Sequence, residues 1–320
     1  MVNVLITGGN GFSGSWLCEH LLNLDKNLHV HTTIRGRCRQ TSFIDHIKDN
    51  LTLVECDLTD YNSVQSTIEE SQPDMIFHLA AISFVPTSWR APQETINTNV
   101  MGTLNLLEAI RKSSFNPKIV VTGTSEEYGL VNKEDLPLKE DAPKNPLSPY
   151  GVSKVAQSLL SYQYHKSYGM KIIRTRAFNL MGPRSGEKIV SANFAKQIVK
   201  FEREKDIPHV LKTGNLDSIR DFNDVRDIVR AYWLAINKCD YGDVYNISTG
   251  IGHKIIEIID IYSKLAKVEF NVMIDEKKSR PSDVPILIGD SSKFREKTGW
   301  KPEISFEKSL SDVLSYWRNQ

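Results

Sequence analysis

The segment Thr122–Gly129, which reads TGTSEEYG, places the hydroxyl groups of Thr124 and Ser125 directly before two carboxylates and a tyrosine. It follows the apolar run KIVV, which is typical of a short buried strand. The polar side chains are therefore expected at the carboxyl end of that strand, the edge where ligands bind in open α/β sheets. Hydroxyl and carboxylate groups at that edge can hydrogen-bond a ligand or exchange protons with it.

A tyrosine and a lysine on one helix face form a second group that could transfer protons. In LSPYGVSKVAQ, Tyr150 and Lys154 are four residues apart, so both side chains share a face. A nearby ammonium favours the phenolate, which predicts a lowered pKa for Tyr150 and a role in proton transfer. Tyr162 and Lys166 repeat the spacing, but at about 100° per residue Tyr162 lies about 120° around the helix from Tyr150. Because both pairs cannot face one pocket, we assign proton transfer to Tyr150 and packing or dimer contact to Tyr162.

A glycine-rich segment, NVLITGGNGFSG, places Gly8, Gly11 and Gly14 between an expected strand and an amphipathic helix. In dinucleotide-binding loops the first glycine permits a tight turn, the second admits a pyrophosphate and the third allows close helix packing. The helix N-terminus then faces the phosphates. The context favours a nucleotide loop over an ordinary glycine turn, and the missing Gly-Lys-Ser/Thr ending argues against a P-loop NTPase.

The end of the second expected strand indicates which dinucleotide binds. An Asp or Glu about 20 residues past the last glycine would bind the ribose hydroxyls of NAD, but this chain reads TTIRGRCR there. Arg35, with Arg37 as the second candidate, offers a guanidinium suited to a 2′-phosphate. NADP(H) is therefore favoured, with NAD(H) as the alternative, unless both arginines are simply solvated.

Apolar runs rich in β-branched residues alternate with amphipathic stretches in the first half of the chain. The expected strands read NVLIT, HVHTTI, LTLVE, DMIFHLA, KIVVTG and KIIRTRAF. This alternation predicts an α/β fold of the Rossmann type, a doubly wound parallel sheet with helices on both faces. The pattern loosens after Ala177, so we expect a dinucleotide-binding domain over residues 1–177 and a smaller α/β lobe over residues 178–320, with some segments returning to the first domain.

The composition is that of an ordinary globular protein. The 320 residues are 40% hydrophobic and 25% charged with a formal net charge of +1, which argues against disorder and against attraction to nucleic acid or an anionic membrane. No apolar stretch approaches the ~20 residues that span a bilayer, and the N-terminal run is too short for a signal peptide. The cysteines form no C-x-x-C pair, and His29 and His31 lack a third ligand, so we expect reduced thiols, a cytoplasmic location and no metal.

Together the motifs resemble the extended short-chain dehydrogenase/reductases over essentially the whole chain. The resemblance rests on the glycine loop, FHLAA, NTNVMGT, the hydroxyls at 124 and 125, and the pair Tyr150 and Lys154. It implies that Tyr150 is the acid/base, that Lys154 supports it and holds nicotinamide ribose, and that Thr124 or Ser125 binds the reacting sugar oxygen. The implied cofactor contacts are Gly8, Gly11, Phe12, Gly14, Arg35, Asp57, Leu58, Leu79, Ala80, Ala81, Asn99, Tyr150 and Lys154. It also implies a homodimer built from helices near 97–112 and 150–168.

Two later segments, GNLDSIRDFNDVRDIV and RPSDVPILIGDSSKFREKTGWKP, resemble those of enzymes that act on GDP-hexoses. The residues that this resemblance assigns to a sugar-nucleotide site are Asn179, Arg184, Lys196, Asn215, Arg220 and Arg280. Arginines also suit a diphosphate inside a nearly neutral protein. The alternative is that these cations form surface ion pairs.

Two reactions are open for such a site. Glu126 matches the base of GDP-mannose 4,6-dehydratases, which remove the C5 proton after oxidation at C4, and GPRSGE partly matches their substrate loop. The loop GGNGFSG, INTNVMGT, SEEYG and the compact second lobe are closer to GDP-4-keto-6-deoxy-D-mannose reductases, whose likeness runs end to end while the dehydratase likeness rests on a few residues. We therefore favour a reductase acting at C4 of a GDP-hexose, with the dehydratase as the alternative; a sugar-nucleotide 4-epimerase and a non-catalytic NADP sensor are less favoured.

Overall fold

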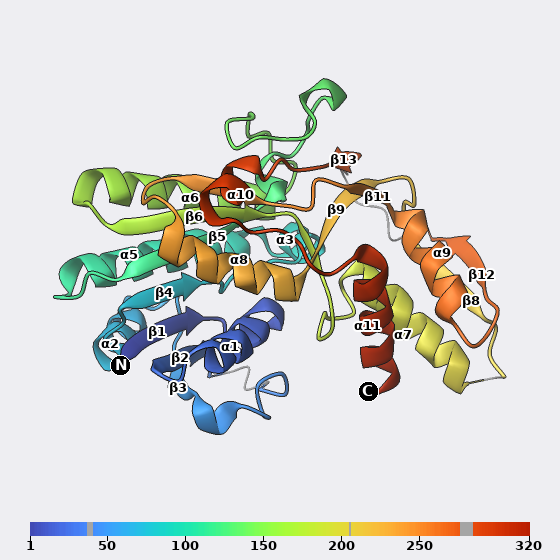
Figure 1. Cartoon of the computed structure of the whole chain (residues 1–320), viewed down its shortest axis with the longest axis horizontal. Coiled ribbons are helices and arrows are strands. Elements are labelled where there is room, and N and C mark those ends of the chain that lie inside the picture. Colours follow the sequence, from blue (N-terminus) through green and yellow to red (C-terminus); the bar gives the residue numbers. More distant parts are fainter. Residues whose placement is uncertain (37–40, 205, 276–283) are drawn as a thin grey trace.

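The computed structural model describes residues 1–36, 41–204, 206–275 and 284–320. Its main feature is a seven-stranded sheet in the order β10-β6-β5-β4-β1-β2-β3, and every pair in it is parallel (Figure 1). The strands are β1 (Val2–Thr7), β2 (Leu28–Ile34), β3 (Thr52–Glu55), β4 (Met75–His78), β5 (Lys118–Thr124), β6 (Lys171–Ala177) and β10 (Val244–Ile247). The order reverses between β1 and β4, as in dinucleotide-binding folds, which confirms the predicted fold class.

The central strand β1 forms at a nearly continuous apolar run. Val4, Leu5 and Ile6 of β1 are all fully buried, because helices cover both faces of a parallel sheet. Successive side chains point to opposite faces, so Val4 and Ile6 enter one core cluster and Leu5 enters another. The apolar runs in the sequence therefore mark strands buried on both sides.

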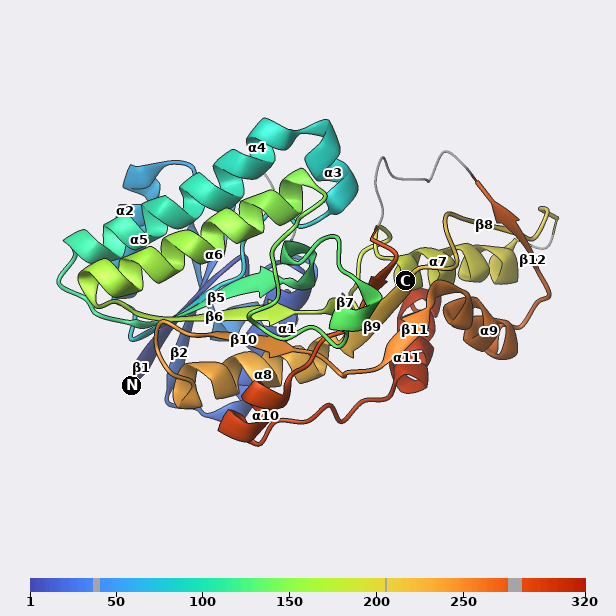
Figure 2. The same cartoon turned by 90° about the horizontal axis from the view of Figure 1, so that it is seen from above.

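Helices cover the main sheet on two faces (Figure 2). Buried residues of α2, α5 and α6 pack on one face, and those of α1, α8 and α10 pack on the other. These helices are α1 (Phe12–Leu24), α2 (Tyr61–Ser71), α5 (Gly102–Lys112), α6 (Pro149–Tyr168), α8 (Val225–Lys238) and α10 (Ser292–Thr298). In α5 the buried Leu106, Leu107 and Ile110 recur at helical spacing, which gives this helix an apolar face.

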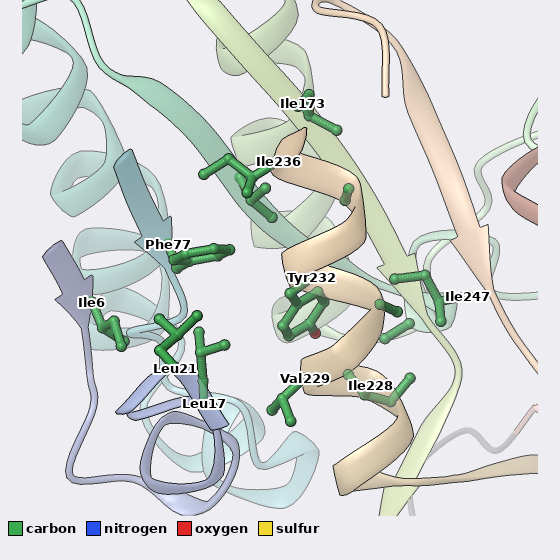
Figure 3. Packing of buried hydrophobic residues seen from close by; sticks show 14 of the residues in the cluster. Ile6, Leu17, Leu21, Phe77, Ile173, Ile228, Val229, Tyr232, Ile236 and Ile247 are labelled. Carbon is green, nitrogen blue, oxygen red and sulfur yellow. The ribbon is translucent and has the colours of Figure 1, made fainter. Parts of the chain in front are cut away.

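Figure 3 shows the core between α1, α8 and the sheet. Leu17 and Leu21 of α1 and Tyr232 and Ile236 of α8 belong to the same buried cluster as Phe77 of β4. Burying each such aliphatic or aromatic side chain contributes about 1.5–3 kcal/mol relative to leaving it exposed. Because this packing holds α1 on the sheet, it also holds the glycine loop that precedes α1.

The second lobe combines three helices with two small sheets. The helices are α7 (Val190–Arg203), α9 (Ile255–Leu265) and α11 (Phe306–Arg318), and the strands are β7 (Asn179–Met181), β8 (Val210–Thr213), β9 (Ile219–Asp224), β11 (Gly252–Lys254), β12 (Asn271–Ile274) and β13 (Ile286–Leu287). β9 pairs with β7, β11 and β13, while β8 pairs with β12. A separate apolar core that includes Phe194, Ile258 and Leu310 joins α7, α9 and α11.

Short helical segments connect these elements. They are α3 (Val85–Arg90), α4 (Pro92–Ile96), the π-helical η2 (Asn97–Met101), and the 3₁₀ turns η1 (Lys48–Asn50), η3 (Ser125–Glu127) and η4 (Lys133–Asp135). α4, η2 and α5 follow one another without a break. η3 lies directly after β5, so the segment TGTSEEYG turns sharply at the sheet edge.

Parts of the chain beyond residue 177 return to the main sheet. β6 ends at Ala177, but β10 pairs with β6, and α8 packs in the core of the first lobe. The sequence analysis expected some segments after residue 177 to return to the first domain, and β10 and α8 do so. The division into residues 1–177 and 178–320 itself stays a prediction.

The described ranges contain no helix with the length and apolar character needed to cross a membrane. Cys18, Cys56 and Cys239 are buried free thiols, and Cys38 lies outside the described residues. His29 and His31 have ring centroids 4.2 Å apart, and among the described residues no group of three or more metal-ligating side chains occurs. The cytoplasmic location stays a prediction.

Candidate active site

A cleft of about 1390 Å³ lies at the carboxyl edge of the main sheet. Its lining comes from the glycine loop after β1, from the ends of β2, β4, β5 and β6, and from the second lobe around α7 and β9. A smaller hollow of about 640 Å³ lies beside β8, β12 and the end of α9, and its lining includes none of the predicted site residues that the structure describes. The larger cleft is therefore the candidate site.

The glycine loop reaches the edge of this cleft in a conformation that needs glycine. Gly8 has a φ of +76°, where side-chain-bearing residues are rarely found, and a Cβ there would lie 3.0 Å from Cα of Ala80. A Cβ on Gly14 would overlap the carbonyl oxygen of Gly8. Gly8 thus permits the tight turn, and Gly14 permits close packing of α1. These are the roles that the first and third glycines have in dinucleotide-binding loops.

The N-terminus of α1 faces the cleft without a side-chain cap. Gly11 is the N-cap residue and has no side chain that could cap the helix. First-turn N–H groups lack intrahelical partners and attract anions. Gly11, Phe12 and Gly14 all line the cleft, so these residues fit the pyrophosphate of a dinucleotide.

Arg35 lies just beyond β2, where the sequence predicts contact with a 2′-phosphate. Its Nε is 3.8 Å from Oδ2 of Asp57, the two side chains are 47% and 44% exposed, and both residues line the cleft. A half-exposed guanidinium at this edge suits a phosphate. Arg37 lies outside the described residues. The other predicted contacts on this wall that line the cleft are Leu58, Leu79, Ala80 and Ala81.

Asn99 lies behind the cleft wall and does not line it. It is fully buried, and its Oδ1 accepts a hydrogen bond of 2.8 Å from the backbone N–H of Ile82. Its Nδ2 donates to the Ile82 carbonyl oxygen at 3.1 Å and to Oγ of Ser153 at 2.9 Å. The residue that the resemblance assigns to the cofactor wall therefore joins the loop after β4 to α6 and holds that wall in place.

Tyr150 lies in the first turn of α6, beside the end of β5. Ser148 caps the helix through a first-turn N–H, and Pro149 occupies its first turn, so the local sequence fixes where α6 begins. Tyr150 lines the cleft although only 7% of its surface is exposed. The Thr124 side chain lies beside Tyr150 in the cleft lining. Of the two hydroxyls that the sequence leaves open, this contact favours Thr124; Ser125 is buried at the cleft wall.

Burial decides the pKa of Tyr150. Loss of water raises that pKa well above its ordinary value, the neighbouring Thr124 hydroxyl opposes the shift, and the charges of Glu126 and Glu127 add to it. The predicted lowering of the pKa by Lys154 is therefore wrong, because burial dominates. The phenol remains protonated at neutral pH and can donate its proton to an alkoxide.

Lys154 is buried one turn further along α6. Its Nζ donates to the carbonyl oxygen of Thr122 at 2.8 Å and to Oε1 of Gln157 at 2.8 Å. Burial lowers its pKa to about 8, against the raising influence of Glu127. The ammonium is therefore held by β5 and α6. It lines the cleft, and its pKa lies close to neutral pH.

The two carboxylates of TGTSEEYG have different environments. Glu127 is fully buried, where its Oε2 accepts a hydrogen bond of 2.7 Å from Nε of Arg176 and its Oε1 accepts one of 3.1 Å from the backbone N–H of Thr124. Glu126 is half-buried, lines the cleft and acts electrostatically on Tyr150. Glu127 is thus part of the scaffold, and Glu126 is the carboxylate that a ligand can meet.

The second tyrosine–lysine pair lies away from the cleft. Tyr162 is 41% exposed, and neither it nor Lys166 lines the cleft. Nζ of Lys166 is 5.6 Å from the Tyr162 ring centroid, and the guanidinium carbon of Arg174 is 5.0 Å from the same centroid. The expectation that only one of the two pairs faces the pocket is confirmed.

Three predicted substrate contacts, Asn179, Asn215 and Arg220, line the second-lobe side of the cleft. Oδ1 of Asn179 is buried without a hydrogen-bond partner in the described structure. Nδ2 of Asn215 donates to Oγ of Ser218 at 3.1 Å, and Nη1 of the buried Arg220 donates to the Ile219 carbonyl oxygen at 2.9 Å. An arginine and two amides at this position suit a diphosphate and the hydroxyls of a sugar.

Two other predicted contacts, Arg184 and Lys196, lie outside the cleft lining. Nη2 of Arg184 is 2.5 Å from Oε2 of Glu19 on α1, and Lys196 forms an ion pair with Glu187. Both cations are therefore bound by carboxylates, as the ion-pair alternative predicts. Arg280 lies outside the described residues.

The cleft also contains residues that sequence analysis did not identify. Lys188 and Phe84 both line it, with Nζ of Lys188 5.3 Å from the Phe84 ring centroid, and Trp89 and Arg90 line it from α3. Single aromatic or basic residues in connecting segments carry no spacing signal. Thr33, whose Oγ1 accepts from the N–H of Gly8 at 3.0 Å, could have been found from its place at the end of β2.

Comparisons with known proteins agree with this geometry. Residues 5–313 match the family described as GDP-mannose 4,6 dehydratase. A GDP-6-deoxy-D-mannose reductase from Pseudomonas aeruginosa is 34% identical over 78% of this chain and 81% of its own. A GDP-mannose 4,6-dehydratase from Yersinia enterocolitica is 32% identical over 98% of this chain and 93% of its own. The structure of RMD from Pseudomonas aeruginosa complexed with NADPH has a TM-score of 0.86 at 30% identity and covers 99% of both chains.

The parallel sheet, the glycine loop and the buried tyrosine and lysine are those of the extended short-chain dehydrogenase/reductases, a class of enzymes. Within that class, the chain belongs to the GDP-mannose 4,6-dehydratase family. The expectation that the dehydratase likeness rests on a few residues is wrong, because the Yersinia dehydratase aligns over 98% of this chain. Reductases and dehydratases are both among its relatives.

Proposed function

We propose that the protein reduces the C4 ketone of a GDP-bound 4-keto-6-deoxyhexose. The observation that carries this proposal is the buried phenol of Tyr150 at the cleft, beside the Thr124 hydroxyl, with a pKa that burial raises. A protonated phenol can neutralise the alkoxide that forms at C4, and the Thr124 hydroxyl can orient the sugar oxygen. NADPH, when bound, supplies the hydride.

Arg35 supports NADP(H) as the cofactor, with NAD(H) as the alternative. It occupies the position where an Asp or Glu would bind the ribose hydroxyls of NAD, and its side chain lines the cleft beside Asp57. A guanidinium there can bind a 2′-phosphate through charge-assisted hydrogen bonds. The similar structure from Pseudomonas aeruginosa is complexed with NADPH.

Glu126 supports a second candidate, a GDP-mannose 4,6-dehydratase. In that reaction NADP⁺, when bound, would take hydride from C4 while Tyr150 takes the hydroxyl proton. The C4 ketone acidifies the C5 proton, a carboxylate removes it, and the C6 hydroxyl leaves as water with a proton from an acid. Hydride then returns to C6 and a proton returns to C5. Glu126 lines the cleft near Tyr150, where a base of this kind is required.

Product analysis distinguishes the two candidates. We expect the purified protein to oxidise NADPH when it is given a GDP-4-keto-6-deoxy sugar and to form a GDP-6-deoxyhexose, followed by absorbance and by mass spectrometry. We expect no product from GDP-mannose with NADP(H). A 4-keto-6-deoxy product from GDP-mannose would overturn the reductase and establish the dehydratase.

The variant Glu126→Gln provides a second test. It removes the candidate base while keeping the size of the side chain, so a dehydratase would lose its activity, whereas a reductase should change by less than about 10-fold, because its proton donor is retained. The exposed Glu134 of η4 gives the matched control Glu134→Gln, for which unchanged activity is expected.

Two other activities make different predictions for the same cleft. A non-catalytic NADP sensor would bind NADPH tightly and turn over neither sugar. A 4-epimerase would interconvert GDP-hexoses without net consumption of NADPH. The buried Tyr150 and Lys154 at the cleft argue against the sensor, because a pocket that only binds the cofactor has no need of a proton-transfer pair.

We also propose a homodimer through helices near 97–112 and 150–168. Val152 and Leu159 of α6, seven residues apart and therefore on one face of the helix, are 48% and 61% exposed although they are apolar. Exposed apolar residues that share one helix face are typical of a protein interface. Light scattering should give a dimer for the native protein and a monomer for Leu159→Lys; a native monomer would contradict the proposal.

A further inference from the structure

A buried chain of hydrogen bonds connects β1 to the ammonium of Lys154. Oγ1 of Thr7 is 2.8 Å from Nδ1 of His78, and Nε2 of His78 is 3.0 Å from Oγ1 of Thr103. Nε2 of Gln157 donates to the same Oγ1 at 2.7 Å, and Oε1 of Gln157 accepts from Nζ of Lys154 at 2.8 Å. None of the five residues is more than 3% exposed. The chain therefore joins β1 and β4 to α5 and α6 through the protein interior.

The positions of the protons in this chain follow from its partners. The hydroxyl of Thr103 donates its single proton to the carbonyl oxygen of Asn99 at 2.7 Å, so Oγ1 of Thr103 accepts from both His78 and Gln157. His78 must then carry its proton on Nε2 and accept from Thr7 at Nδ1. An ammonium has no acceptor, so the amide oxygen of Gln157 has to face it. Only one orientation of the Gln157 amide satisfies both neighbours.

This arrangement places the charge of the network on Lys154. Burial lowers the pKa of His78 to about 3, and the charge of Lys154 acts in the same direction, so the imidazole is neutral. Burial lowers the pKa of Lys154 to about 8, which leaves the ammonium largely charged at neutral pH. The other titratable groups that face Lys154 and Tyr150 are Glu126 and Glu127 beside β5 and Tyr232 of α8.

We propose that Gln157 is a positioning residue that orients the Lys154 ammonium and stabilises its charged form for proton transfer at Tyr150. Within the described structure, Gln157 and the carbonyl oxygen of Thr122 take two of the three N–H donors of the ammonium. The third N–H donor can therefore bind a ligand in the cleft. Lys154 lines the cleft, whereas Gln157 does not. The inference rests on the roles proposed for Tyr150 and Lys154. It adds Gln157 as the residue that orients Lys154.

The expected effect follows from the positive charge of the Lys154 ammonium, which donates the hydrogen bond to Gln157. A hydrogen bond to a charged group stabilises that form, and its loss changes the pKa of the group by about one to two units. Gln157→Met keeps an unbranched side chain but removes the acceptor, so the pKa of Lys154 should fall from about 8. Gln157→Glu adds a negative charge beside the ammonium, so that pKa should rise.

The test measures the pH profile of NADPH-dependent turnover for both Gln157 variants. The alkaline limb should move down by about one to two pH units in Gln157→Met and up in Gln157→Glu. If Gln157 had only a structural role, both variants would lower the stability of the protein, but the alkaline limb would not move in opposite directions. Gln163, exposed on the same helix, gives the matched control Gln163→Met, whose profile should equal that of the native protein.

A second measurement does not depend on activity. Carbon-13 NMR of protein labelled at lysine Cε, with the Lys154 signal assigned by Lys154→Met, reports the pKa of Lys154 directly. The same opposite shifts are expected in the absence of cofactor and substrate. An unchanged Lys154 titration in folded Gln157→Glu overturns the inference, and this variant retains a polar side chain should Gln157→Met fail to fold.

The outcome can be separated from that of the proposed function. If Tyr150→Phe and Lys154→Met keep full activity, the proposed catalytic roles fail, whatever the Gln157 variants do. If both abolish activity while the Gln157 variants leave the Lys154 titration unchanged, only the positioning role fails.

Discussion

The two sides of the cleft differ in how their residues are held. On the cofactor side, the glycine loop, the wall after β4 and the start of α6 are fixed by backbone, and these predicted contacts meet at one edge of the sheet. On the substrate side, the contacts depend on where long cationic side chains reach. Arg220 lines the cleft, and Arg184 and Lys196, which do not line it, form ion pairs with Glu19 and Glu187.

The difference shows which kind of site residue a fold determines by itself. A strand end or a glycine turn has one location once the sheet order is set, because its position depends on backbone topology. A side chain with several rotatable bonds reaches many partners, and its final contact depends on residues far away in the sequence. Substitutions on the two sides should therefore differ in the size and the kind of their effects.

The largest effect is expected on the cofactor side, from Tyr150→Phe. Removal of the phenolic proton donor should lower kcat by about 10²–10⁴-fold, because general acid catalysis contributes that much. Steady-state kinetics with the 4-keto sugar measure it, and Tyr162→Phe, exposed on the same helix, is the control. Equal losses in both variants would contradict the assignment of Tyr150.

Arg220→Met tests the substrate side. Loss of a charge-assisted contact to a diphosphate should raise KM for the nucleotide sugar by about 10–100-fold with a smaller change in kcat. Arg220→Lys keeps the charge but not the planar fork, so it should restore only part of the affinity. A KM within twofold of the native value in a folded Arg220→Met would remove Arg220 from the site.

Arg35→Ala tests the far end of the cofactor side. The preference for NADPH over NADH should fall by about 10-fold or more, because the guanidinium at the 2′-phosphate is lost. Titration of both cofactors by fluorescence measures the ratio. If the native preference survives, the arginine is a solvated surface residue and the 2′-phosphate has another partner.

The pH profile tests the state of Lys154. Its pKa is lowered by burial to about 8, so the ammonium is present below that pH and is lost as the pH rises through it. Activity should therefore fall above about pH 8, by about tenfold per unit. Tyr150 cannot cause this limb, because its pKa is raised. A profile that stays flat well above that pH would show that the ammonium is not required.

The smallest effect on substrate binding is expected from Arg184→Met. The guanidinium pairs with Glu19 and lies 4.1 Å from the Trp16 ring centroid, outside the cleft lining. KM for the nucleotide sugar should stay within about twofold, and thermal stability should fall slightly, because a partly exposed ion pair contributes about 0–1 kcal/mol. A tenfold rise in KM would return Arg184 to the substrate site.

The sequence predicts most of the fold and the cofactor side because those signals are local. Apolar runs mark the strands, and three glycines mark the turn. The roles of Glu126 and Glu127 could not be separated in this way, because the turn η3 and the distant Arg176 bury Glu127 and leave Glu126 half-buried at the cleft. The pKa of Tyr150 was mispredicted for a similar reason, since spacing reveals the neighbouring ammonium but not the depth of burial.

The late strand β10 has a consequence for how the molecule can be made. A ribosome that has synthesised only residues 1–177 has not yet made β10, which pairs with β6, or α8, which covers an apolar face of the sheet. The nascent first lobe should therefore expose an unpaired strand edge and uncovered apolar surface until the second lobe has been translated. Truncation after Ala177 is expected to yield an aggregating fragment, because β10 and α8 are then missing from the sheet and its core.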